Sequence, residues 1–509
     1  MKIIRVNICI FLIVFSVLSA SGTIIESKYI EENFNDDYNL KKQLIDKSGI
    51  SDYWNEQDKL LSTVGATDDY FGCSVSIDGN YAIIGAYGYD ESTGSAYIFK
   101  RDGTSWTEEQ KLTASDGDSG DFFGSSVSIH ENLVIIGAYG DNSNTGSAYI
   151  FNRSGTTWIE EQKLTASDGE AGDFFGSSVS INGDIAIIGA YGDDSFTGSV
   201  YAFNSTGSIW SEYYKLEAFD RASGDRFGNS VSFDGTFAII GAYGDDSYTG
   251  SAYILEHCCY WKWREKVNVS GGLPYFGWSV SIEGDYAIIG APDIPDSGSP
   301  GSAYIFKRDE NRWFEHVSFD GINNGEYLGV SVSIDGGHAI AGAYGDDGST
   351  GIAYIFNRNE TTWTEEQKLT ASDGETGDYF GICVSISAGY TIIGAYGDEE
   401  NTGSAYVFIK VGIPDLSIEI SGGYGIGVLI KNIGENETNN LDLEINVKGG
   451  WFNFVDKTFD YTIDLLPGES RFLTTPIFLG LGKVYITAST DFKEKTVEGI
   501  QFVIYTYVK

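Results

Sequence analysis

The sequence predicts an all-β fold: a closed ring of seven four-stranded sheets, followed by a β-sandwich. Three observations predict it. First, a unit of about 52 residues recurs seven times. Second, a complete unit holds four strand-like segments. Third, the last unit lacks its fourth segment, and a matching segment lies before the first unit. Repeats of this length, each with four short strands, are typical of a β-propeller.

Each unit opens with a Phe-Gly pair and continues with segments of strand character. In the second copy, residues 126–129 alternate polar and apolar, which predicts a strand with one buried face. Residues 133–136 are continuously apolar, as in a strand covered on both faces. Residues 147–151 and 158–164 supply two further strands. The glycines that end the opening pair are Gly72, Gly124, Gly176, Gly228, Gly277 and Gly381, with Leu-Gly ending at Gly329.

The fourth segment begins with a tryptophan and has an apolar residue six positions later. The last unit lacks this segment, but Trp54 and Leu60 repeat it in phase before the first unit. We therefore expect residues 53–410 to form a propeller that the N-terminal strand closes, which removes open sheet edges. A linear solenoid would not explain that strand. The other pairs are Trp106/Leu112, Trp158/Leu164, Trp210/Leu216, Trp263/Val269, Trp313/Phe319 and Trp363/Leu369.

The segments outside the repeats have different characters. Residues 1–22 combine Lys2 and Arg5 with a short apolar run and small residues, which predicts a secretory signal peptide. An uncleaved membrane anchor is less favoured because the run is short for a span. Residues 23–52 form an acidic lead-in. Alternating apolar residues in 413–509 predict an immunoglobulin-like β-sandwich of six or seven strands.

The charge and the reactive side chains narrow the function. With 73 Asp and Glu against 32 Lys and Arg, the formal net charge is −41, which argues against binding nucleic acid or anionic lipid. The histidines form no catalytic or metal-binding motif, so we expect no enzyme, although carboxylates for a carbohydrate-active enzyme are plentiful. Of the four cysteines after the leader, Cys258 and Cys259 are adjacent, and Cys73 and Cys383 either form a disulfide or stay free.

The Phe-Gly pair and the following Ile-Ile-Gly-Ala stretch resemble the FG-GAP repeat of integrin α-subunit propellers, and more closely a microbial exported branch of that family. The resemblance covers about residues 53–410. It implies a secreted or cell-surface adhesion protein whose partner is an extracellular protein or glycan, without catalysis. The family's calcium loop cannot be carried over, because the connection at Asp78-Gly79 is too short to supply the oxygen ligands. A structural surface-layer component is a further alternative.

Acidic residues recur on the face that carries the connections between units. We consider them weak calcium ligands, against the alternative of a solvated face that uses Asp and Gly for turns. The candidate calcium ligands are Asp116, Asp118, Asp121, Asp168, Glu170, Asp173, Asp373, Glu375 and Asp378.

Two further residue sets are candidates. A tyrosine follows Gly-Ala in six units and either contacts a ligand or packs between blades. Five Asn-x-Ser/Thr sequons are candidate glycosylation sites, three of them in the turn on the opposite face. The tyrosines are Tyr87, Tyr139, Tyr191, Tyr243, Tyr344 and Tyr396, and the sequons begin at Asn152, Asn204, Asn268, Asn359 and Asn436.

Overall fold

The computed structural model describes residues 52–269, 274–292, 299–412, 416–423, 425–432, 438–449, 455–465, 469–474, 482–489, 494–502 and 505–508. The chain divides into two compact units, residues 53–412 and a unit that contains residues 413–509, and each is described by itself. The expected signal peptide and almost all of the lead-in lie outside the described residues. No helix within these ranges is long and apolar enough to cross a membrane.

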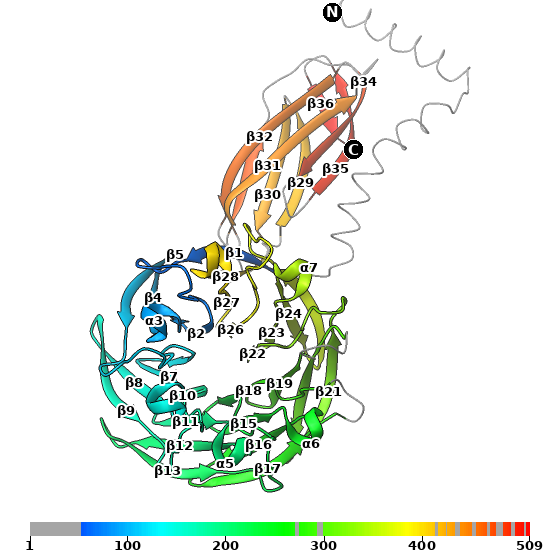
Figure 1. The fold of residues 1–509 in the computed structure, drawn as a ribbon. Helices are drawn as coiled ribbons and strands as arrows, with labels where there is room; N and C mark the ends of the chain where they lie inside the picture. The colour runs from blue at the N-terminus through cyan, green and yellow to red at the C-terminus, as the bar shows by residue number, and fades with distance from the viewer. Residues whose placement is uncertain are drawn as a thin grey trace, which may run out of the picture. The chain divides into compact units, whose positions relative to one another are not determined.

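Residues 53–412 form seven four-stranded sheets, or blades, arranged in a ring (Figure 1). The predicted seven-bladed, all-β propeller is confirmed. In blades one to six the strands follow chain order across each sheet. Blade one contains β2 (Ser74–Asp78), β3 (Tyr81–Ala86), β4 (Ser95–Asp102) and β5 (Ser105–Leu112); blade two β6 (Ser126–His130), β7 (Leu133–Ala138), β8 (Ser147–Ser154) and β9 (Thr157–Leu164); blade three β10 (Ser178–Asn182), β11 (Ile185–Ala190), β12 (Ser199–Ser205) and β13 (Trp210–Leu216).

Blade seven takes strands from both ends of the propeller segment. Its sheet order is β1-β28-β27-β26, so the N-terminal strand β1 lies beside β28. Blade four contains β14 (Val231–Phe233), β15 (Phe237–Ala242), β16 (Ser251–His257) and β17 (Trp261–Val267); blade five β18 (Ser279–Glu283), β19 (Tyr286–Ala291), β20 (Ser302–Asp309) and β21 (Arg312–Asp320); blade six β22 (Val332–Asp335), β23 (His338–Ala343), β24 (Ile352–Asn359) and β25 (Thr362–Leu369); blade seven β26 (Val384–Ser387), β27 (Tyr390–Ala395), β28 (Ser404–Gly412) and β1 (Asp52–Leu60).

The fourth strand of blade four differs from the expectation. Trp261, not Trp263, is the tryptophan equivalent to Trp210, because Trp261 pairs with His257 as Trp210 pairs with Ser205. Trp261 is buried in the core between blades, whereas Trp263 is partly buried and packs against that core. The hairpin of this blade is one residue shorter, with three residues between His257 and Trp261 against four between Ser205 and Trp210, so the equivalent tryptophan comes one residue early in the repeat.

The repeated Phe-Gly pair has a packing reason. Phe123 is fully buried, and its ring packs edge-on against Tyr149 with ring centroids 5.4 Å apart. Gly124 has φ 91°, and a Cβ there would lie 2.2 Å from the carbonyl oxygen of Ser95 in the neighbouring blade. Only glycine allows this conformation and this approach. The pair therefore joins each blade to the one before it.

The inner strands are joined by a continuous ring of hydrogen bonds. In each blade a serine hydroxyl accepts a hydrogen bond from the main-chain N–H of an apolar residue in the next blade, with N···Oγ distances of 3.1–3.2 Å. The ring includes the bond from the Ile77 N–H to Ser385 Oγ, which joins blade one to blade seven. The accepting serines are Ser76, Ser128, Ser180, Ser232, Ser281, Ser333 and Ser385.

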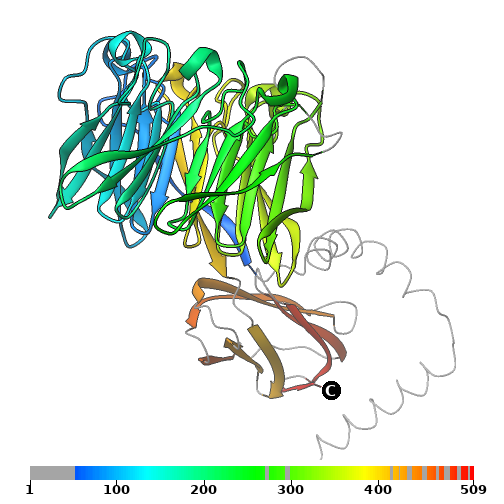
Figure 2. The ribbon, with the colours of Figure 1, turned by 90° about the horizontal axis from the view of Figure 1, so that it is seen from below.

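The connections divide between two faces, and the helical turns lie along one of them (Figure 2). We call this the loop face; it carries the turns between the second and third strands and the connections between blades. The opposite hairpin face carries the other two turns of each blade. The helical turns are α3 (Tyr89–Ser92), α4 (Asp141–Asn144), α5 (Asp193–Phe196), α6 (Asp245–Tyr248), α7 (Asp346–Ser349) and α8 (Asp398–Asn401).

The described strands of the C-terminal unit form one eight-stranded sheet. Its order is β32-β31-β34-β35-β36-β29-β30-β33, and the neighbouring strands pair antiparallel. The sequence pattern predicted six or seven strands. The bounds are β29 (Leu416–Gly423), β30 (Gly425–Asn432), β31 (Thr438–Gly449), β32 (Val455–Leu465), β33 (Ser470–Thr474), β34 (Gly482–Ser489), β35 (Glu494–Phe502) and β36 (Tyr505–Val508).

Candidate functional site

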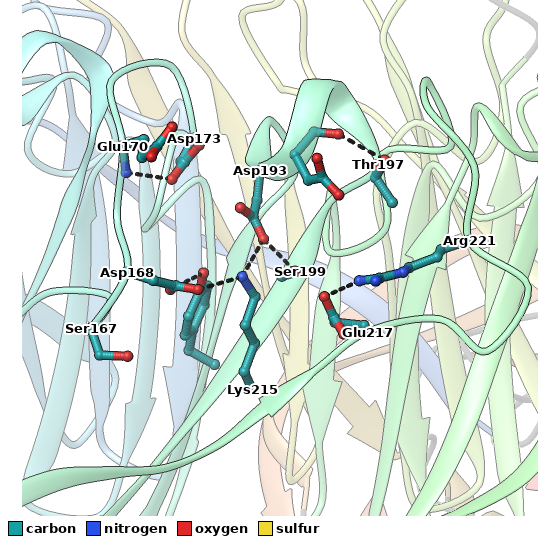
Figure 3. Close-up of polar contacts among 12 residues, drawn as sticks. Ser167, Asp168, Glu170, Asp173, Asp193, Thr197, Ser199, Lys215, Glu217 and Arg221 are labelled. Carbon is teal, nitrogen blue, oxygen red and sulfur yellow. Dashed lines mark hydrogen bonds and ion pairs between the residues drawn. The ribbon is translucent and has the colours of Figure 1, made fainter.

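A lysine lies between two carboxylates on the loop face of blade three (Figure 3). Lys215 Nζ is 2.8 Å from Asp168 Oδ2 and 2.7 Å from Asp193 Oδ2. The Tyr201 hydroxyl donates to Asp168 Oδ1 at 2.8 Å, and the Ser199 hydroxyl donates to Asp193 Oδ2 at 2.5 Å. A blade connection, the turn α5 and the strand β13 thus meet at one ammonium group. We call such a lysine with its two aspartates a lysine clamp.

The clamp recurs in blades two, four and seven. In each, the lysine Nζ lies 2.5–2.7 Å from both carboxylates, and a tyrosine hydroxyl donates to the outer one. In blade seven the lysine comes from β1 and both aspartates come from the far end of the propeller segment. The three clamps are Lys163 with Asp116 and Asp141, Lys266 with Asp220 and Asp245, and Lys59 with Asp373 and Asp398.

The clamp shifts the pKa values of its members. Burial opposes the charge of Lys215, but hydrogen bonds to Asp168 and Asp193 outweigh it, so the pKa of the ammonium is raised. Burial also opposes ionisation of Asp168, yet the hydrogen bonds from Lys215 and Tyr201 hold its pKa below the usual value. The pKa of the lysine is raised in all four clamps, so each clamp carries its own cation at neutral pH.

The third acidic residue of each predicted calcium loop has another role. Asp173 is buried, and its carboxylate accepts the Glu170 N–H at 2.6 Å. Burial raises the pKa of Asp173. Asp121 accepts the Asp118 N–H, and Asp378 accepts the Glu375 N–H, in the same way.

The three acidic residues of a loop are therefore not brought together. The first contacts the clamp lysine, the third caps the loop, and the middle residue, Asp118, Glu170 or Glu375, contributes its N–H to that cap. Among the described residues, no group of three His, Cys, Asp or Glu side chains could hold a metal ion. Sequence reasoning missed the clamp lysines, although the recurring Lys-Leu at the end of the fourth strand carried the signal.

Blades one and six depart from the clamp. In blade one, Val64 and Tyr89 stand at the two aspartate positions, and Lys111 Nζ lies 2.8 Å from the centroid of the Tyr89 ring. In blade six, Lys368 donates to the Tyr354 hydroxyl at 2.9 Å, and that hydroxyl contacts the buried Glu326.

Pockets of about 530 and 570 Å³ lie beside α7 and α6, between the helical turn and the preceding blade connection.

The candidate tyrosines belong to a collar of aromatic rings around the propeller axis. Each follows the second strand of its blade, and in five blades it contacts the ring just before the innermost strand at 5.0–5.2 Å between centroids. Ring contacts with centroids 5.7–6.1 Å apart join the collar residues of most neighbouring blades. All these rings are half-buried. The aromatic collar comprises Tyr70, Tyr87, Phe122, Tyr139, Phe174, Tyr191, Tyr243, Tyr275, Tyr327, Tyr344, Tyr379 and Tyr396.

Two positions interrupt the collar. Arg226 stands where the other blades have an aromatic residue before the innermost strand, and Pro292 stands at the tyrosine position of blade five. The Trp278 ring lies with its centroid 4.7 Å from that of Tyr243 and partly replaces the missing ring contacts. The aromatic collar therefore differs in composition from blade to blade.

Three of the four described sequons lie next to the hairpin face, and Asn268 lies in the connection between blades four and five. Asn152, Asn204 and Asn359 are at the ends of β8, β12 and β24, next to the hairpin face, and Asn268 is exposed just after β17. Asn436 lies outside the described residues.

All four described cysteines are free thiols. Cys383 Sγ lies 2.9 Å from the Gly72 carbonyl oxygen across the junction of blades seven and one, and burial raises the pKa of Cys73 to about 11. Cys258 and Cys259 are exposed.

Comparison with known proteins identifies the repeat. The profile of the FG-GAP repeat matches residues 54–99, 106–151, 158–203, 210–255, 273–306 and 363–408, just over half of the chain. Five of these segments join the fourth strand of one blade to the first three strands of the next. No curated protein matches the chain. The phase of the Phe-Gly pairs, the seven blades and this profile agree, and the chain belongs to the FG-GAP repeat family.

Proposed function

We propose that this protein is a secreted or cell-surface recognition protein that binds an extracellular protein or glycan through the loop face, without catalysis. The aromatic collar carries the proposal. It sets half-buried rings around the axis of one face, where part of each side chain remains exposed to solvent. Aromatic rings with one accessible side are a common basis of recognition surfaces. The FG-GAP propeller is, in addition, a fold of the ligand-binding or adhesion type.

The distribution of the perturbed carboxylates supports a role without chemistry. Lowered pKa values occur at Asp116, Asp168, Asp220 and Asp373, which hold the same position in four blades and all contact a lysine. A glycosidase needs one pair of carboxyl groups with separate roles at one place. The repeated arrangement instead stabilises each loop.

Further parts of the proposal concern the rest of the chain. We propose that residues 1–22 direct export and that β1 closes the ring through its place beside β28. We also propose that the C-terminal unit, whose eight described strands form one continuous sheet, folds that sheet over itself as an immunoglobulin-like sandwich. Glycans at Asn152, Asn204 and Asn359 would leave the loop face free, because these residues are next to the hairpin face.

A glycan array and a whole-cell binding screen test the proposal, both run with the chain from residue 23 onward, with and without calcium. We expect selective binding that Trp278→Ser and Tyr344→Ser reduce at least tenfold. Ile209→Ser is the control, because Ile209 is 61% exposed in the third-to-fourth-strand turn on the hairpin face. Binding that all three substitutions leave unchanged would exclude the loop face, and the absence of any binding would favour a scaffold role.

A further inference from the structure

Three loop-face residues depart from the repeat at the boundary of blades three and four. Before the innermost strand, blade four has Arg226, whereas the equivalent residues in the other blades are aromatic. At the fourth position of the helical turn, blades three and four have Phe196 and Tyr248. The equivalent turn residues in four other blades are Ser92, Asn144, Ser349 and Asn401.

The two turn aromatics are exposed and conformationally unfavourable. Phe196 is 41% exposed and Tyr248 is 43% exposed, and their φ angles are 62° and 68°. The left-handed region suits asparagine but is unusual for a bulky side chain. The fold itself accepts Ser or Asn at this position, as the other blades show. Phe196 stacks on Tyr191 at 6.2 Å and Tyr248 contacts Tyr275 at 5.6 Å between centroids, so each ring packs on one side only. Residues held in such a backbone conformation often serve a functional site.

Arg226 lies with its guanidinium close to both of these rings and to Tyr243. Its guanidinium carbon is 5.6 Å from the Phe196 centroid, 5.0 Å from that of Tyr243 and 5.7 Å from that of Tyr248, and Nη1 contacts the Tyr243 hydroxyl. The Arg226 N–H donates to the Phe196 carbonyl oxygen at 2.8 Å. Within the described part of the chain, Arg226 forms no ion pair with a carboxylate, in a protein with 73 Asp and Glu.

The nearby carboxylates are engaged elsewhere, with one exception. Asp225 accepts the Ala222 N–H, and Asp245 is paired with Lys266 at 2.5 Å. Asp246 is exposed at the left-handed second position of α6. The guanidinium is thus oriented by aromatic rings. Its Nε is buried and makes no hydrogen bond with the described residues, and Nη1 contacts the Tyr243 hydroxyl. The Nη1–Nη2 edge is therefore the part that an acceptor from outside the chain can reach.

We propose that Phe196, Arg226 and Tyr248 form a binding site for a sugar that carries a carboxylate, such as a uronic acid. A guanidinium binds a carboxylate through two parallel hydrogen bonds, and its plane is fixed here in advance. The two exposed rings lie 5.6 and 5.7 Å from the guanidinium carbon, near enough to pack against the apolar faces of the sugar. The net charge of −41 favours an isolated carboxylate over a dense polyanion. This inference rests on the proposed recognition function and names its ligand class.

The test uses the full chain and two probes: a trisaccharide with one terminal glucuronic acid, and its methyl ester, which lacks the charge. Calorimetric titration measures binding, and thermal unfolding measures folding. Arg226→Phe and Tyr248→Asn restore the residue types that other blades carry, so we expect an unchanged or higher thermal midpoint. We expect both to weaken acid binding about tenfold or more, while Ile209→Ser leaves it unchanged.

The outcomes separate this site from the general function. Preference for the acid over the ester, lost in Arg226→Phe at full stability, supports the site. Equal binding of both probes, or acid binding that survives Arg226→Phe, overturns it and leaves recognition through the loop face intact. If neither probe binds, the uronic acid site is likewise rejected, and the cell-binding screen still decides the general function.

Discussion

Asp168 and Asp173 belong to one blade connection, yet their surroundings move the pKa values of their carboxyls in opposite directions. Asp168 has a lowered pKa, so its contribution to stability is present above the unfolded value of 3.8 and is lost as the pH falls through the folded value. Asp173 has a raised pKa, so the folded state gains stability as the pH falls through that value.

Single variants separate the two effects. Relative to Asp168→Asn, the wild type should lose stability as the pH falls below 3.8, although the effect is reduced because Asp168 is 51% exposed. Relative to Asp173→Asn, the wild type should gain stability as the pH is lowered towards 3.8. Urea unfolding at each pH measures both differences. If the free energy of unfolding changed with pH in the same way in the wild type and both variants, the assigned pKa shifts of Asp168 and Asp173 would be wrong.

Single residues also mark the limit of what the sequence predicted. The repeat placed Asp116, Asp168 and Asp373 on the loop face, and the structure has them in clamps. Their lysines were not foreseen, because Lys215 is remote from Asp168 in sequence and only the blade geometry brings them together. Arg226 was overlooked for a related reason: its significance depends on Phe196 and Tyr248 in neighbouring turns.

At the scale of elements, the proposed closing strand makes a testable contribution. Trp54 on β1 is 2% exposed, and its Nε1 donates to Glu366 Oε2 at 3.0 Å in blade six. We expect Trp54→Ala to reduce the free energy of unfolding by about 3–5 kcal/mol, as for other buried aromatics, measured by denaturant titration. Trp106→Ala, on β5 inside the continuous chain of blade one, is the matched comparison.

A chain that starts at residue 61 extends the same experiment. Without β1, the edge of β28 is unpaired, and exposed edges promote association. Light scattering should then show oligomers at concentrations where the longer chain is monomeric. A monomeric, fully stable truncated chain would mean that β1 does not close the ring.

The elements were predictable where one pattern repeated. Residues 126–129 and 133–136 signalled β6 and β7, because alternation and apolar runs reflect burial directly. The helical turns such as α4 were not predicted, since their central residues Asn142 and Ser143 are left-handed and leave no helical period. In the C-terminal unit no second copy was available for comparison, and the strand number was underestimated.

For the whole propeller, the clamps predict the response to cations. A net charge of −41 is self-repelling, so sodium chloride should raise the thermal midpoint by screening. Calcium at matched ionic strength should add nothing, because each clamp lysine already lies between its two carboxylates. In Lys215→Met, Asp168 and Asp193 lose that cation, and we expect a calcium-dependent rise to appear. A calcium-specific shift of the wild type would contradict this account.

The path of the chain around the ring has a mechanical consequence. The chain leaves β1 in blade seven, passes through blades one to six, and returns to blade seven at β26, so a peptide segment crosses every boundary between blades. The one joint without a covalent link lies inside a sheet, between β1 and β28. Tension applied across the two ends of the propeller therefore acts first on a ladder of main-chain hydrogen bonds. The resistance of the proposed closure to tension is then set by that ladder together with the Lys59 clamp and the Trp54 hydrogen bond to Glu366, which also hold β1 in place.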